Sequence, residues 1–117
     1  MGIQQLNILF LISSQDRFPV NSKEHTYIVT DTIRDTLRIL HEQSIDVVFI
    51  HQDFDVSPIL TQYPFSPCIV LGTRDRATYL QKLLDQGVLD YLFIDEPHWL
   101  DEFDAYLNRL WRIRNSL

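Results

Sequence analysis

Acidic and histidine side chains gather in one short segment near the middle of the chain. His51 ends an apolar run, and Asp53 and Asp55 follow it two residues apart. Carboxylate oxygens are preferred ligands of hard cations such as Mg²⁺, and a carboxylate can also act as a nucleophile. The segment predicts a displaced phosphoryl acceptor or a weak cation site, with Asp16 as a further ligand, or else a solvated acidic loop. We favour the solvated loop.

Other chemistry-bearing residue types lack the spacing that their chemistry needs. Cys68 is the only cysteine and lies in an apolar run, so we expect a small buried hydrophobic residue. With three glycines, the chain has no phosphate-binding glycine motif and no nucleophile elbow. The histidines show no metal-ligand spacing; they are His25, His41, His51 and His98. We therefore expect no metal and no cofactor.

Length and charge narrow the class of protein. A chain of 117 residues with 45% hydrophobic residues supplies one core, so residues 1–117 are expected to form one domain. The net charge of -6 and the lack of a Lys/Arg run argue against nucleic acid and anionic membranes as partners. The first apolar run, Leu6 to Ile12, is too short to span a membrane. We expect a cytoplasmic protein.

Five apolar runs alternate with amphipathic stretches along the chain. The runs are nearly continuous in Val, Ile, Leu and Phe, which is typical of parallel strands buried on both faces. This pattern predicts an α/β fold with a flavodoxin-like, doubly wound, five-stranded parallel sheet. The expected strands are Leu6 to Ile12, Tyr27 to Thr30, Asp46 to Ile50, Cys68 to Leu71 and Leu89 to Ile94.

Helical spacing of apolar residues predicts three regular helices, Asp31 to Gln43, Arg74 to Gln86 and Pro97 to Arg114. Thr32 and Asp35 match a capping box, and Gly87 suits the left-handed position past a helix end. Pro97 suits a first helical turn. The inward stripe of the last helix is expected to be Leu100, Phe103, Leu107 and Leu110.

The first and third crossover connections are short for such a fold. Residues Ser13 to Thr26 show no helical period, so a loop or one helical turn is expected there. Between Gln52 and Pro67, three prolines leave room only for a short helix around Ser57 to Tyr63. Helix coverage of the sheet is therefore expected to be uneven.

Three segments in this order resemble the receiver domain of bacterial response regulators, the CheY-like family. They are Ile45 to Ile50, Pro67 to Leu71 and the Gly-x-x-Asp-Tyr-Leu segment Gly87 to Leu92. In that family a carboxylate at the end of the third strand accepts a phosphoryl group, and an acidic pair after the first strand holds a cation. A hydroxyl residue ends the fourth strand and a lysine ends the fifth. The resemblance implies a module of two-component signal transduction.

The residues at these family positions depart from the pattern. The acceptor position carries His51, and the acidic pair falls on Ser13 and Ser14. The hydroxyl position falls on Gly72, with Thr73 adjacent, and the lysine position falls on Ile94. Phosphoryl transfer needs a carboxylate, hard cation ligands and a cationic partner for the phosphoryl oxygens. The chain thus resembles a pseudo-receiver with a vestigial acceptor pocket, and we expect no enzyme activity.

Aromatic residues indicate where such a module would bind. The receiver resemblance implies an interaction face made by the helix Arg74 to Gln86, the strand Leu89 to Ile94 and the last helix. Aromatic side chains at a surface are favoured anchors of interfaces. The candidates on this face are Tyr79, Tyr91, Trp99 and Tyr106, and Tyr91 occupies the family's switching position. We expect a protein partner or a homodimer through this face.

The leading hypothesis from the sequence is therefore a regulatory module that acts by protein-protein interaction without phosphorylation. It would be either free-standing or the N-terminal regulatory domain of a larger bacterial signalling protein. Two alternatives stay open, namely an atypical phospho-accepting receiver that uses Asp53 and a flavodoxin-like small-ligand binder.

Overall fold

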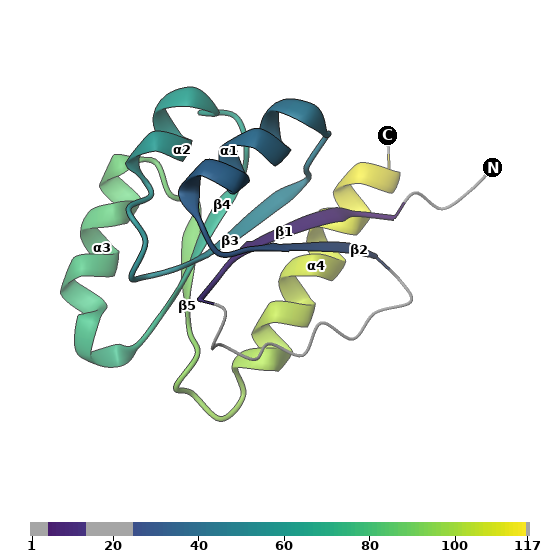
Figure 1. Cartoon of the computed structure of the whole chain (residues 1–117). Helices are drawn as coiled ribbons and strands as arrows, with labels where there is room; N and C mark the ends of the chain where they lie inside the picture. The colour runs from purple at the N-terminus through teal and green to yellow at the C-terminus, as the bar shows by residue number, and fades with distance from the viewer. Residues whose placement is uncertain (1–4, 14–24, 117) are drawn as a thin grey trace.

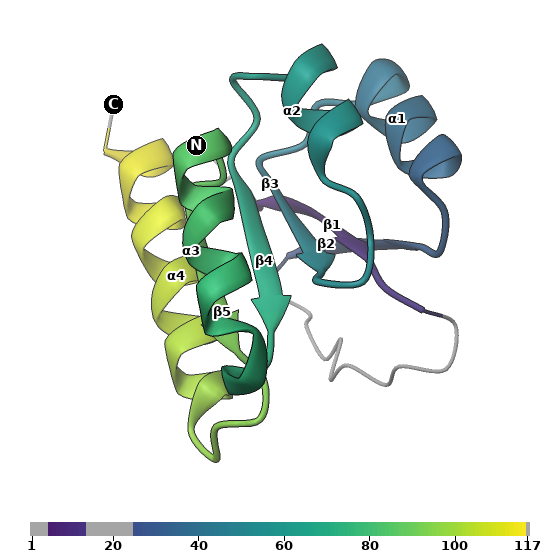
Figure 2. The ribbon, with the colours of Figure 1, turned by 90° about the vertical axis from the view of Figure 1, so that its left-hand side faces the viewer.

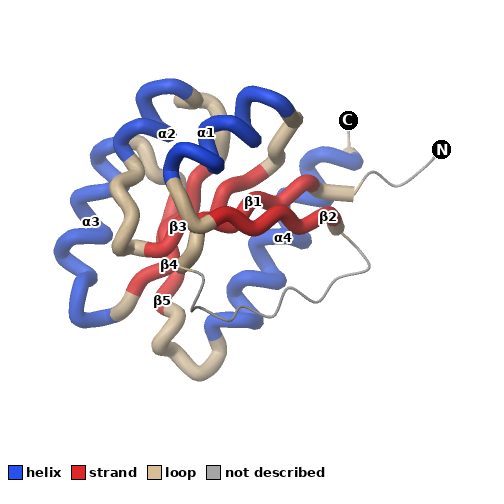
Figure 3. The backbone as a smooth tube through the Cα atoms, viewed as in Figure 1, coloured by secondary structure: helices blue, strands red, loops and turns tan. Residues whose placement is uncertain are grey.

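A five-stranded parallel sheet lies between two helical layers (Figure 1). The computed structural model describes residues 5–13 and 25–116. Figure 3 shows the strands at the centre of the molecule, and their order across the sheet is β2-β1-β3-β4-β5. The strands are β1 (Asn7–Leu11), β2 (Thr26–Thr30), β3 (Val47–His51), β4 (Cys68–Gly72) and β5 (Asp90–Phe93). The flavodoxin-like, doubly wound α/β sheet expected from the sequence is confirmed.

The three inner strands bury both of their faces. Every residue of β4 is buried, as are all residues of β1 and β3 except Asn7 and His51 at their ends. Successive side chains point to opposite faces, so each inner strand contributes to two separate core layers. In one layer α1, α2 and α3 cover the sheet, and in the other α4 covers it (Figure 1). This explains the nearly continuous apolar runs in the sequence.

Local signals explain where most helices begin and end. α1 (Ile33–Glu42) begins where the Thr32 hydroxyl oxygen accepts a hydrogen bond from the Asp35 N–H at 3.0 Å, as the capping signal predicts. α2 (Ser57–Gln62) has six residues, so the third crossover helix is short. A single 3-10 turn (Arg74–Arg76) precedes α3 (Ala77–Gln86), which ends at Gly87 with φ of 119°. The last helix, α4, spans Trp99–Asn115.

Two expectations for α4 are wrong. Pro97 lies before the helix and not in its first turn, because α4 begins at Trp99. Leu100 is 40% exposed, whereas Trp99 packs against the core layer under α4. The buried stripe is therefore shifted by one residue at the start of the helix and then follows Phe103 and Leu107 as expected. The first crossover, expected to be a loop or one turn, falls mostly on residues 14–24, outside the described residues.

Phenylalanine rings form the centre of the core layer under α4. The Phe49 ring on β3 stacks on the Phe10 ring of β1, with centroids 5.2 Å apart, and lies 4.9 Å from the Phe103 ring of α4. Phe49 is fully buried. These contacts attach α4 to the sheet. Within residues 5–13 and 25–116, no helix is long and apolar enough to cross a membrane.

Candidate functional site at the carboxyl edge of the sheet

The expected pocket residues follow the carboxyl ends of the strands. His51 ends β3, Gly72 ends β4, Ile94 follows β5 and Ser13 lies just past β1. Parallel strands end at the same edge of a sheet, so these residues share one edge. Ser14 and Asp16, the other expected members of the pocket, lie outside the described residues.

A buried glutamine joins the ends of β3 and β4. The Gln52 side chain donates from Nε2 to the Thr73 hydroxyl at 2.9 Å and accepts from the Thr73 backbone N–H at 3.0 Å. Its own backbone N–H donates to the Leu71 carbonyl at 2.9 Å. Gln52 is only 7% exposed. The Thr73 hydroxyl also donates to the Asp75 carboxylate, so the one hydroxyl close to the expected position is already engaged on both sides.

Asp53, the alternative acceptor, forms internal contacts with a cation and a histidine. An Arg76 guanidinium nitrogen donates to Asp53 Oδ1 at 3.1 Å. His51 Nδ1 lies 3.4 Å from Asp53 Oδ2 and accepts a hydrogen bond from the Asp53 backbone N–H at 3.2 Å. The Asp53 side chain is 69% exposed, so the ion pair is weak and accessible to solvent. The carboxylate therefore lies on the outer surface of the loop, against Arg76.

A second arginine links the loop after β4 to the loop after β5. The Arg74 guanidinium pairs with the Glu96 carboxylate, and the Arg74 backbone N–H donates to Asp95 Oδ2 at 3.2 Å. With the Arg76 and Gln52 contacts, three loops at the carboxyl edge are joined by side chains of the chain itself. Cationic partners at this edge thus come from the loop after β4 and pair with carboxylates of neighbouring loops.

At the position expected for a hydroxyl residue, any side chain would have to displace Leu80. A Cβ atom at Gly72 would lie 2.5 and 2.9 Å from the two methyl carbons of Leu80 and 3.0 Å from Gln52 Oε1. Leu80, on α3, is fully buried. Glycine at this position therefore allows α3 to pack closely on β4.

Asp55 and Ile94 make contacts that stabilise the fold. Asp55 Oδ1 accepts from the Ser57 backbone N–H at 3.0 Å, and this hydrogen bond lowers the pKa of the Asp55 carboxyl. The contact therefore contributes stability above the ordinary pKa of an aspartate, and this contribution is lost as the pH falls. Ile94, at the expected lysine position, packs against the core layer under α4. Among the described residues, no three Asp, Glu, His or Cys side chains lie together as a metal site would need.

Cys68 has the environment expected of a structural cysteine. Its side chain is buried within β4, and burial raises the pKa of the thiol to about 12. A thiol with such a pKa is not the nucleophilic thiolate at neutral pH.

The four aromatic candidates divide between a surface groove and the core. The groove, about 430 Å³ in volume, lies between β5 and α4 and is lined by Tyr91 and Tyr106 together with Glu102 and Arg109. Figure 1 shows α3 and α4 on opposite sides of β5, and in Figure 2 both helices lie at the end of the sheet away from β2. The Arg109 guanidinium lies 4.9 Å from the Tyr106 ring centre, and Arg76 lies 4.7 Å from that of Tyr79, outside the groove.

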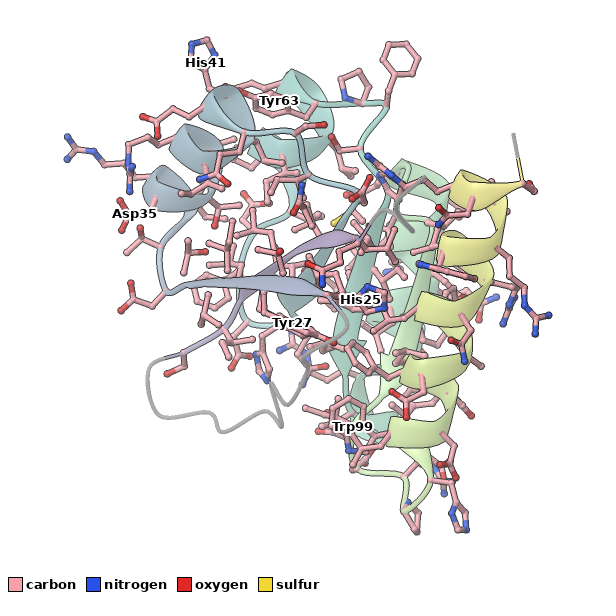
Figure 4. All side chains as sticks on the ribbon, turned by 90° about the vertical axis from the view of Figure 1, so that its right-hand side faces the viewer. His25, Tyr27, Asp35, His41, Tyr63 and Trp99 are labelled. Atoms are coloured by element: carbon pink, nitrogen blue, oxygen red, sulfur yellow. The ribbon has the colours of Figure 1, made fainter. Side chains whose placement is uncertain are left out.

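Trp99 does not line this groove. Its ring meets the Phe103 ring edge to face at 6.1 Å, and it packs in the core layer under α4. Figure 4 shows Trp99 near the start of α4, on the side of the helix that faces the sheet. Tyr91 and Tyr106 thus line one groove from opposite faces of the sheet. The Tyr91 ring packs with Phe93 against the core layer under α1, α2 and α3, and Tyr106 packs against the layer under α4.

Solved structures share this architecture. The receiver domain of the TMAO respiratory system response regulator TorR superposes with a TM-score of 0.70 at 20% identity, over 92% of this chain and 98% of that one. A response regulator receiver domain protein from Clostridium thermocellum superposes with a TM-score of 0.75 at 17% identity, over 96% of this chain and 98% of that one. The chain has the receiver fold. A protein named as the pilus assembly protein CpaE2, from Sinorhizobium meliloti 1021, gives 0.58 at 18% identity over 90% and 99%.

Sequence comparisons add no further relative. No family model matches the chain, and no curated protein matches it. The receiver fold is therefore established by the three-dimensional structure, at a level of identity where the fold alone is shared.

Within this receiver fold, sequence reasoning missed the side chains that fill the carboxyl edge. Gln52 and Arg76 were not singled out, although both contact expected pocket residues, Thr73 and Asp53. The one available signal was position, because Gln52 follows β3 directly and Arg76 lies in the first turn after β4. A polar residue at such a position predicts a contact at the edge but not its partner.

Proposed function

We propose that this receiver-fold domain is a regulatory module that acts by binding a protein partner and does not accept a phosphoryl group. The observation that carries the proposal is the network at the carboxyl edge, where Gln52 is hydrogen-bonded to Thr73 and Asp53 is paired with Arg76. Phosphoryl transfer to a carboxylate needs an open acceptor, a bound divalent cation and a free cation or hydroxyl for the phosphoryl oxygens. In this domain the polar side chains at the carboxyl edge are instead hydrogen-bonded or ion-paired with each other.

The residue at the end of β3 supports the same reading. His51 Nδ1 accepts the Asp53 N–H, and an imidazole brings neither the charge nor the oxygen atoms that Mg²⁺ prefers. Ser13 brings no charge either, and Ile94 is a partly buried apolar residue packed against the core layer under α4. The alternative acceptor, Asp53, is paired through Oδ1 with Arg76, and its Oδ2 lies 3.4 Å from His51 Nδ1.

Exposure to acetyl phosphate, or to beryllofluoride with Mg²⁺, is expected to leave the domain unmodified and its melting temperature unchanged. A ligand at a hundred times its dissociation constant would add about 2.7 kcal/mol to the free energy of unfolding, which a thermal melt detects readily. Intact mass spectrometry measures the modification directly. A phosphorylated species that disappears in Asp53→Asn would show that Asp53 is an acceptor and would overturn the proposal.

The matched control in this experiment is His51→Asp, which places a carboxylate at the end of β3. It is expected to remain unmodified as well, because Ser13 and Ile94 still supply no partner for a cation or for phosphoryl oxygens. Mg²⁺-dependent phosphorylation of His51→Asp would mean that the rest of the pocket is functional.

The groove between β5 and α4 is the surface to which we assign partner binding. Tyr91 and Tyr106 are half-buried there, and two aliphatic side chains outside the groove lining, Leu89 just before β5 and Ile113 on α4, are 54% and 63% exposed. Half-buried aromatic rings at a surface provide anchors that lose little entropy on binding. A homodimer through this face, expected from the sequence, stays a prediction.

Tyr91→Ala and Tyr106→Ala are each expected to weaken binding of the physiological partner by at least ~1 kcal/mol. The partner is first captured with the parent domain, and its affinity for each purified variant is then measured by calorimetry. Phe65→Ala is the control, because Phe65 is a 97% exposed aromatic in the loop between α2 and β4. Equal affinities of the folded Tyr91→Ala, Tyr106→Ala and parent proteins would place the partner elsewhere.

A further inference from the structure

β2 is an edge strand of the sheet. Within residues 5–13 and 25–116 it pairs with β1 alone, and its sequence Thr-Tyr-Ile-Val-Thr contains no charge, proline or glycine. Val29 in this strand is 51% exposed. Edge strands normally carry charges, prolines or bulges that prevent pairing with another strand. The opposite edge strand, β5, carries Asp90 and has α3 and α4 on either side (Figure 1).

Hydrogen bonds at the two ends of β2 show which backbone groups face outward. The Thr26 N–H donates to the Leu6 carbonyl at 2.9 Å, and the Thr30 carbonyl accepts from the Ile12 N–H at 3.0 Å. Backbone groups alternate in direction along a strand, so Ile28 also faces β1 and Val29 faces away from it. A groove of about 350 Å³ follows this outer edge between β2 and α1.

We propose that the outer edge of β2 binds the same edge of a second copy of this chain, antiparallel, with the two-fold axis at Ile28. In this register all five residues of β2 lie opposite residues of the second copy. The outward-facing backbone N–H and C=O groups of Val29 then form hydrogen bonds across the dimer interface. It places Thr26 opposite Thr30 of the second copy, Tyr27 opposite Val29, and Ile28 opposite Ile28. Aromatic and β-branched side chains are favourable cross-strand neighbours, whereas the Thr30 hydroxyl is already hydrogen-bonded within its own chain to the Phe10 carbonyl and to Thr36. The five residues are thus complementary to their own reverse, as a two-fold interface requires.

Charges on α1 favour the same arrangement. Asp31, Asp35 and Arg38 line the groove beside β2, so both signs of charge flank the edge. Figure 4 shows Asp35 on the α1 side of the sheet and Tyr27 on the opposite side of β2. The Arg38 guanidinium nitrogens lie 3.8 Å from Asp35 Oδ1 and 3.4 Å from Glu42 Oε2, and the Arg38 side chain is 56% exposed. In the dimer each α1 helix lies beside its symmetry mate, where Arg38 can pair with acidic groups of the second copy.

Analytical ultracentrifugation of the parent chain over a range of concentrations tests the proposal. We expect a monomer-dimer equilibrium that Val29→Lys weakens at least ~10-fold, since a lysine on the edge opposes strand pairing. Val29 is exposed, so the variant should keep its fold, which circular dichroism checks. Phe65→Lys adds the same charge at a 97% exposed side chain and should dimerise as the parent does.

A cysteine scan tests the register. Ile28→Cys is expected to form an intermolecular disulfide under mild oxidation, because directly opposed residues of a non-hydrogen-bonded pair have Cα atoms about 4.5 Å apart, within disulfide range. Val29→Cys should not crosslink, since its symmetry mate lies on a diagonal, about 7–8 Å away or more. Native Cys68 is buried with a thiol pKa of about 12, so it does not compete.

Three outcomes would overturn the β2 dimer. They are a parent chain that stays monomeric, a Val29→Lys variant that dimerises like Phe65→Lys, and a dimer in which Val29→Cys crosslinks but Ile28→Cys does not. A dimer that is lost in Tyr91→Ala and Tyr106→Ala but kept in Val29→Lys would assign self-association to the groove between β5 and α4. That result would contradict this inference and leave the proposed function standing.

Discussion

Phe49→Ala is expected to lower the free energy of unfolding by about 3–5 kcal/mol, the range for removing a fully buried phenylalanine. Phe49 has no exposed surface, and its ring contacts Phe10 on the neighbouring strand and Phe103 on α4. Truncation would therefore leave a cavity where α4 joins the sheet, which neither neighbour can fill without moving. The total free energy of unfolding of a domain of this size is about 5–15 kcal/mol, so the substitution removes a large part of its stability.

Urea unfolding followed by circular dichroism measures this loss. Phe65→Ala provides the control, because Phe65 is 97% exposed and its removal should change the free energy by no more than about 0.5 kcal/mol. If Phe49→Ala unfolded at the same urea concentration as Phe65→Ala, the packing between α4 and β3 described above would be wrong.

Gly72→Ser is expected to lower the free energy of unfolding by about 1–3 kcal/mol through overpacking. The substitution supplies the hydroxyl that the receiver family carries at the end of the fourth strand. Its Cβ atom would lie 2.5 Å from one methyl carbon of Leu80, well inside van der Waals contact. Leu80 is fully buried, so its side chain can move away only by repacking against its neighbours. The backbone at Gly72 has ordinary dihedral angles, so packing and not conformational strain is the cause.

A double-mutant cycle with Leu80→Ala separates this cause from others. Leu80→Ala alone should lower the free energy of unfolding by about 2–5 kcal/mol because it leaves a cavity. Gly72→Ser should cost less in that background than in the parent chain, because the methyl carbons that it meets are gone. Strictly additive losses would mean that the serine destabilises β4 for a reason unrelated to Leu80.

The sequence was sufficient to predict the architecture because its signals are local and repeated. Continuous apolar runs specify strands buried on both faces, and Thr32 and Gly87 mark helix ends by their own chemistry. The start of α4 was less predictable. Leu100 and Trp99 are adjacent apolar residues, and which of them faces the core depends on where the helix begins relative to Pro97.

The candidate site was predictable in position but not in its contacts. The ends of the strands placed His51, Gly72, Thr73 and Ile94 at one edge. Nothing local says that Gln52 would turn inward to Thr73, since the two residues are 21 positions apart and meet only once β3 and β4 pair. The pairing of Asp53 with Arg76 depends in the same way on the turn before α3.

The order of strands across the sheet places β2 and β5 at opposite edges. A dimer joined at β2 would therefore hold its two grooves between β5 and α4 at the far ends of one continuous sheet, roughly 40 Å apart if ten strands keep their usual spacing. Such a particle is bivalent. A partner that carries two copies of its binding segment with a linker of matching span would gain avidity of about 10²–10⁴ over a single contact, by effective concentration alone. Output would then respond to the total concentration of the domain, because only the paired form engages both segments at once.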